Sequence, residues 1–96
     1  MRIAEVVGTV TLAKSHPAMA GARLRLVVPL TGAELQSGAP GRGESIVAWD
    51  PHGAGVGDRV AVSEGAEAAQ PFRPDPKPID AYCAAILDNV HFGAAK

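Results

Sequence analysis

Residues 45–63 read SIVAWDPHGAGVGDRVAVS and predict two short strands joined by a glycine-rich turn. Ser45–Trp49 is a short apolar segment typical of a strand, and in Arg59–Ser63 Val60 and Val62 lie on one face, which is the period-two pattern of a strand. The three glycines between the two segments allow backbone conformations and close approaches that larger residues do not. This strand, turn and strand together predict a fold made mainly of β-structure.

Three further strands are predicted outside residues 45–63. The first is Arg2–Leu12, in which every even position from Ala4 onward is apolar or glycine. Gly8 in its middle indicates a bulge or a sharp bend. The second is Arg23–Leu30, where leucine and valine on one face alternate with arginine and valine on the other. The last strand is expected from about residue 85 to residue 92.

The connections are predicted to be irregular, apart from one short helix near the C-terminus. Thr31–Glu44 is rich in glycine and polar residues and is expected to form a mobile loop. Ala66–Pro78 holds four prolines and is expected to be extended. Asp80 is the expected N-cap of a short helix through Ala84. Five strands and one short α-helix predict a mainly β protein, a small five-stranded OB-like β-barrel.

The composition fits one folded domain spanning residues 1–96, with 47% hydrophobic and 20% charged residues. A formal net charge of −1 gives no basic surface, so neither nucleic acid nor a membrane is expected as a partner. No apolar run approaches the ~18 residues of a membrane span, and the acidic Glu5 argues against an export signal. A single cysteine, Cys83, fits a reducing compartment, so a cytoplasmic protein is predicted.

No combination of residues predicts a catalytic, cofactor or metal site. His16, His52 and His91 are far apart in the sequence and match no metal-binding motif. Asp50 is close to His52 but lacks a third partner, so a surface or loop role is expected for this pair. Cys83 lies among alanines and an isoleucine and is expected to be a small buried residue rather than a nucleophile. The chain is therefore not expected to be an enzyme.

The glycine-rich turn differs from phosphate-binding loops in the element that comes after it. Such loops lead into a helix whose N-terminal amides meet the anion, whereas Arg59–Ser63 alternates like a strand and Asp58 would repel an anion. The glycines therefore indicate a close backbone approach, and a second copy of the chain is the expected neighbour. Apolar residues on both faces of Arg2–Leu12 and Ser45–Trp49 also indicate self-association.

Four blocks of sequence, in the same order, resemble the EutN/CcmL-type vertex proteins of bacterial microcompartments. They stand here as VVGTV at residues 6–10, GARLRLVV at residues 21–28, VAWDPHGAGVGD at residues 47–58, and PIDA at residues 78–81 followed by an aliphatic segment that ends in Ile86, Leu87 and Asp88. One departure from the family's pattern comes after the fourth strand. Members typically carry Gly-Ser-Ser-Ala-Arg there, where residues 65–69 of this chain are GAEAA.

The resemblance implies a small barrel that assembles into homopentamers. Its function would be structural: the pentamers would cap the vertices of a polyhedral bacterial microcompartment shell and contact hexameric and trimeric shell proteins. A head-to-tail cyclic interface supplies the fixed rotation that such a ring needs. The loop of His52, Gly53, Ala54, Gly55, Val56 and Gly57 is expected at a subunit interface or at the central pore. No cofactor is implied.

Two other functions are compatible with the sequence. An OB-like barrel could serve as an oligonucleotide-binding module, although 4% aromatic residues and a net charge of −1 fit such a role poorly. A small enzyme or carrier inside the compartment would depend on Asp50, His52 and Cys83 alone.

Overall fold

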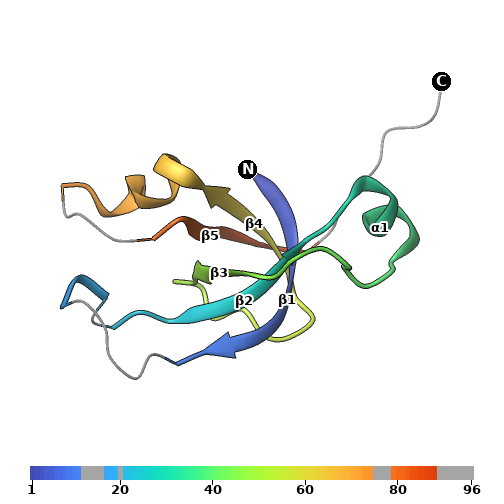
Figure 1. Cartoon of the computed structure of the whole chain (residues 1–96), viewed down its shortest axis with the longest axis horizontal. Coiled ribbons are helices and arrows are strands. Elements are labelled where there is room, and N and C mark those ends of the chain that lie inside the picture. Colours follow the sequence, from blue (N-terminus) through green and yellow to red (C-terminus); the bar gives the residue numbers. More distant parts are fainter. Residues whose placement is uncertain (12–16, 20, 75–78, 89–96) are drawn as a thin grey trace.

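The computed structural model describes residues 1–11, 17–19, 21–74 and 79–88, in which five strands close into a barrel (Figure 1). The strands are β1 (Arg2–Val10), β2 (Leu24–Pro29), β3 (Ile46–Trp49), β4 (Arg59–Glu64) and β5 (Ala81–Leu87). Their order around the barrel is β1-β2-β3-β5-β4. Strands β3 and β5 pair in parallel, and the other neighbours are antiparallel. The predicted mainly β, five-stranded barrel is confirmed.

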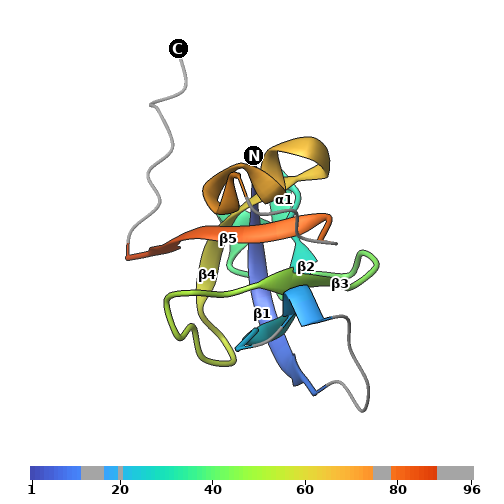
Figure 2. The ribbon, with the colours of Figure 1, turned by 90° about the vertical axis from the view of Figure 1, so that its left-hand side faces the viewer.

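Three short helices lie in the connections of the described part of the chain. They are the 3-10 helices η1 (Pro17–Met19) and η2 (Gly65–Phe72) and the α-helix α1 (Gly32–Ser37). Figure 2 shows η2 beside β5, at the opposite side of that strand from β3. Phe72 of η2 packs edge-on against Trp49 and Tyr82, with ring centroids 4.6 and 5.5 Å apart. The packing of these three rings holds η2 against the barrel.

The segment Thr31–Glu44, predicted to be an irregular loop, contains α1. Thr31 is its N-cap: its Oγ1 accepts a hydrogen bond from Glu34 N, and Glu34 Oε1 accepts one from Thr31 N. This reciprocal capping box satisfies two backbone donors at the helix start. Gly38 ends the helix with a φ of 73°, the left-handed conformation that glycine adopts readily. The sequence signal for the helix was Thr-x-x-Glu followed by glycine.

The short helix predicted near the C-terminus is wrong, because β5 occupies residues 81–87. β5 pairs with β4 from the Glu64–Ala81 pair to the Arg59–Leu87 pair. Without this pairing the backbone donors and acceptors of β4 would be exposed along one edge of the sheet. Closure of the barrel therefore overrides the helix signal of Asp80. The end of the predicted last strand, at residues 89–92, lies outside the described residues.

Small aliphatic side chains fill the barrel. The core comprises Ala4, Val6, Val27, Ala48, Ala54, Val60, Val62, Ala81 and Cys83, with Ile46 packed against it. On β2 the core residue is Val27, so strand alternation places Arg25 on the same inward face. Leu24 and Leu26 are then on the outer face of the barrel. The more polar of the two faces of β2 is the one that points inward.

Gly8 marks a bulge in β1, as predicted. The pairing with β2 shifts between Val6, which lies opposite Val27, and Gly8, which lies opposite Leu26. The intervening Val7 is the extra residue and is 41% exposed. Such a bulge bends the strand and increases its twist, which helps a short strand to close a small barrel.

Gly41, in the loop that follows α1, packs against the outer face of β2. A Cβ at this position would lie 2.7 Å from Val28 Cγ1 and 2.9 Å from Leu30 Cδ2. Because a valine side chain is stiff, we expect Gly41→Ala to lower the free energy of unfolding by about 1–3 kcal/mol in urea denaturation. Gly43→Ala is the matched control, since its Cβ would approach Pro29 O no closer than 3.7 Å. Equal losses in the two variants would contradict this account.

Candidate functional site

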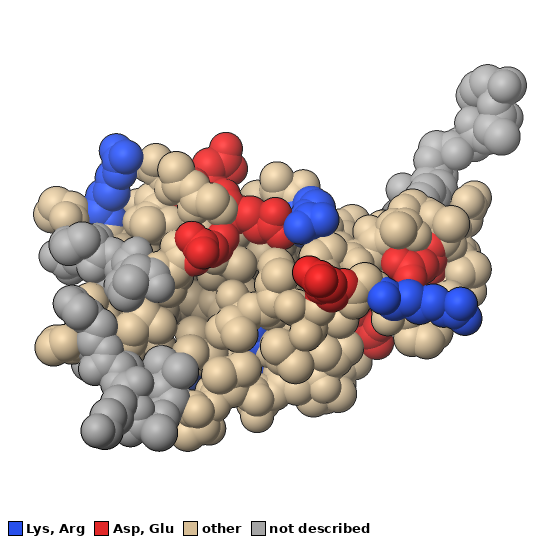
Figure 3. Space-filling model, in the orientation of Figure 1, with Lys and Arg blue, Asp and Glu red and all other residues tan. Residues whose placement is uncertain are grey.

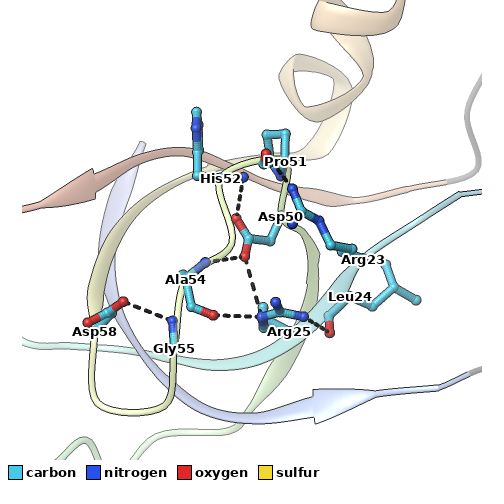
Figure 4. A network of polar contacts seen from close by, with 9 residues as sticks. All are labelled: Arg23, Leu24, Arg25, Asp50, Pro51, His52, Ala54, Gly55 and Asp58. Carbon is cyan, nitrogen blue, oxygen red and sulfur yellow. Dashed lines mark hydrogen bonds and ion pairs between the residues drawn. The ribbon is translucent and has the colours of Figure 1, made fainter.

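The buried carboxylate of Asp50 shapes the loop between β3 and β4 (Figure 4). Asp50 Oδ1 accepts a hydrogen bond from His52 N at 2.9 Å. Asp50 Oδ2 accepts one from Ala54 N at 2.6 Å. Aspartate commonly turns the chain in this way, by accepting backbone N–H groups a few residues further on. Both oxygens of one side chain thus hold the backbone of the loop.

Two arginines, one in β2 and one just before it, attach this loop to the neighbouring strand. Arg25 Nε lies 3.3 Å from Asp50 Oδ2 and donates to Ala54 O at 2.8 Å. Arg23 Nη2 donates to Pro51 O at 2.7 Å. A buried charge is tolerated when it is paired and fully hydrogen-bonded. Among the described residues, no buried side-chain nitrogen or oxygen lacks a hydrogen-bond partner.

The loop is also attached to β1 and β5. Gly57 N donates to Val6 O at 2.8 Å, and Val6 N donates to Asp58 O at 2.9 Å. His52 Nε2 lies 3.0 Å from Ala84 O on β5. With the bonds to β2, these contacts hold the loop at several points along its length. The loop is therefore a rigid part of the barrel despite its glycines.

The six residues predicted to form an interface or pore loop are placed together, but they differ in exposure. Ala54 is buried and belongs to the core. Val56 is 70% exposed, and His52 is also exposed. Gly53 and Gly57 have φ values of +78° and +95°, where other residues are strained. The loop thus presents one large apolar side chain, Val56, on a backbone that glycine makes possible.

Asp50 and His52, predicted to share a surface or loop role, are in different environments. His52 is exposed, whereas Asp50 is fully buried and supports the loop from inside. Arg25, the partner of Asp50, belongs to another strand, and no sequence motif links the two residues. The available signal was strand alternation, which places Arg25 on the same face as Val27.

Cys83 is buried in the core, as predicted. Burial, followed by the charge of Asp50, raises the pKa of its thiol from 9.0 to about 11, and Arg25 opposes this shift. The thiol is therefore protonated near neutral pH, and the protonated form is a poor nucleophile.

The described residues contain no group of three or more His, Cys, Asp or Glu side chains that could hold a metal ion. His16 and His91 lie outside this part of the chain. None of the helices in the described ranges is long and apolar enough to cross a membrane.

Comparison with known families tests the resemblance. Residues 1–88 match the family described as ethanolamine utilisation protein EutN/carboxysome. The chain belongs to the EutN/CcmL family. It is 37% identical over 93 residues to the carboxysome shell vertex protein CcmL of Synechococcus elongatus, covering 95% of this chain and 87% of that one.

Solved structures of EutN/CcmL proteins share this fold. The match to Gloeobacter violaceus CcmL has a TM-score of 0.83 and 30% identity, and covers 96% of this chain and 90% of that chain. The GrpN pentameric microcompartment shell protein of Rhodospirillum rubrum matches with a TM-score of 0.79 and 31% identity. This match covers 97% of this chain and 100% of that chain. These relatives are shell proteins, so the chain is a structural shell vertex protein and not an enzyme.

The residues that differ from the family's Gly-Ser-Ser-Ala-Arg pattern lie at exposed or half-buried positions of η2. Gly65 has a φ of +64° and Ala68 is fully buried, and these two residues keep the family's types. Ala66 and Glu67 are exposed and Ala69 is half-buried. The differences therefore alter the surface of η2 while the backbone and the core contact are kept.

Loss of the Asp50 carboxylate should destabilise the whole barrel. Asp50→Ala leaves the half-buried Arg25 without its ion-pair partner and the N–H groups of His52 and Ala54 without their acceptor, so we expect a loss of about 3–5 kcal/mol in urea unfolding. Glu64→Ala is the control, because it removes an ion pair with Arg2 whose side chains are 56% and 36% exposed. That variant should lose less than about 1 kcal/mol. A similarly small loss for Asp50→Ala would refute the role of the carboxylate.

Stability at alkaline pH should reveal the burial of Cys83. Between pH 9 and about 11 the unfolded chain releases the thiol proton before the folded chain does, so wild-type stability should fall as the pH rises. Cys83→Ala removes this contribution, and its stability should fall by less over the same range. Urea unfolding at successive pH values measures the difference between the two proteins. Parallel curves would show that the thiol does not titrate differently on folding.

Proposed function

We propose that the chain forms a homopentamer that caps the vertices of a polyhedral bacterial microcompartment shell in the cytoplasm. The observation that carries this proposal is the full-length similarity to the pentameric shell protein GrpN, with a TM-score of 0.79. Residues 1–96 would act as a single vertex domain. The function is geometric, because a layer of six-sided tiles closes into a polyhedron only if five-sided units occupy its corners.

A closed ring of identical subunits requires a head-to-tail interface, in which two different surfaces of each subunit meet. We propose the loop from His52 to Gly57 as one of these surfaces. Its exposed position and its attachment to β1, β2 and β5 support this role. A loop that is already ordered loses little conformational entropy when a neighbour binds.

The partners of the ring would be the other shell proteins of the compartment, hexameric and trimeric, along its rim. Relatives named as shell vertex proteins support this assignment. An oligonucleotide-binding role is less well supported. Figure 3 shows Asp and Glu side chains among the Lys and Arg side chains of one face, where a nucleic-acid site would need a continuous basic surface.

Native mass spectrometry tests both the ring and the loop. The wild type should have about five times the 9.8 kDa mass of one chain. Gly55→Val should weaken the ring while leaving the subunit folded, because a Cβ there would lie 3.8 Å from Asp58 Oδ2, an ordinary contact. Gly32→Val, at an exposed glycine of α1 with nothing within 4 Å of its Cβ position, is the control.

Two outcomes would count against the proposal. A wild-type monomer at micromolar concentration would overturn the homopentamer. A Gly55→Val variant that assembles as well as the control would remove the loop from the interface.

A further inference from the structure

The loop supplies one of the two surfaces that a head-to-tail ring needs, and the structure also contains a candidate for the second. We propose that Val56 is the apolar anchor of the loop and that it packs on a row formed by Gly8, Leu26 and Val47 of the next subunit. This inference rests on the proposed homopentamer and adds to it the pair of contacting surfaces.

Val56 has the properties of an interface anchor. The residue is 70% exposed, so burial against a neighbour would remove apolar surface from water. The loop around it is already held, because Gly55 N donates to Asp58 Oδ2 at 2.8 Å and Asp58 N donates to Gly55 O at 3.0 Å. Preorganised contacts of this kind lose less entropy on association than mobile ones.

The proposed receiving row crosses three neighbouring strands on the outside of the barrel. Gly8 of β1 lies opposite Leu26 of β2, and Leu26 lies opposite Val47 of β3. Residues that are directly opposed in antiparallel strands point to the same face. Val47 is 45% exposed and Leu26 is half-buried, while Gly8 has no side chain to fill its end of the row. The row is therefore apolar, and its surface projects least from the barrel at Gly8.

Other exposed apolar side chains are less suited to be the second surface. Among the described residues, the large exposed ones besides Val56 are Met1, Val7, Val47 and Ile86. Val7 is the extra residue of the bulge and has no partner opposite it on β2, and Ile86 lies opposite the core residue Val60 of β4. Met1 lies outside the strands. Val47 is the one that belongs to an apolar row across several strands.

The distribution of charge favours the same surface. In Figure 3 the Asp and Glu side chains lie mainly in the upper part of the view and toward the α1 end, and the part of this face where β2 and β3 run in Figure 1 is mostly uncharged. The centre of a protein interface is depleted in charged residues, and its rim is polar. An apolar contact bordered by charges fits this pattern.

A charge-swap experiment tests the pair directly. Val56→Asp and Val47→Lys each place a charge in the proposed contact, so each should raise the concentration at which half of the rings dissociate by about tenfold or more. In the double variant the two opposite charges meet at every interface of a head-to-tail ring. Dissociation should then return to within about threefold of the wild type. Sedimentation velocity over a dilution series measures these concentrations, and urea unfolding checks that the subunits remain folded.

Ile86→Lys combined with Val56→Asp is the matched control, because Ile86 is 40% exposed and lies on β5, outside the row, and this pair should not restore assembly. An unchanged Val56→Asp ring, a double variant no better than the weaker single variant, or equal rescue by Ile86→Lys would each overturn the proposed contact. A wild-type protein that is not a pentamer would instead overturn the proposed function, whatever the variants do.

Discussion

The contact between the Asp50 carboxylate and Arg25 is the interaction on which the rest of the structure depends. It places a paired charge against a core made of alanines, valines and a cysteine, where an unpaired charge would be costly. The carboxylate is retained because an apolar residue could not accept the two backbone N–H groups that turn the chain after β3. The loop that carries the proposed subunit contact is thus formed before any neighbour binds.

Closure of the barrel limits how the subunits can associate. Each of the five strands has a hydrogen-bonded neighbour on both sides, so the described part of the chain offers no free sheet edge for a second copy to extend. Association must therefore use loops and the outer faces of strands. The apolar residues that the sequence places on both faces of β1 and β3 provide such faces, because one face fills the barrel while Val7 and Val47 remain exposed.

Sequence patterns predicted the elements that local rules determine. Alternation or a short apolar run located all or part of every strand, and Gly8 marked the bulge in β1. The helix α1 was missed because the Thr31 and Glu34 capping box lies in a segment rich in glycine. The last strand was assigned in part to a helix because Asp80 resembles an N-cap, whereas pairing with β4 decides the outcome. The Arg25 and Asp50 contact depends on strand register, which no single segment encodes.

A structure of the assembled oligomer, determined by electron cryomicroscopy or crystallography, tests the central claim most directly. This account predicts a closed ring of five subunits with residues 52–57 of each lying at the boundary with the next. A ring of any other rotational order, or a ring of five in which this loop contacts no neighbouring subunit, would contradict it.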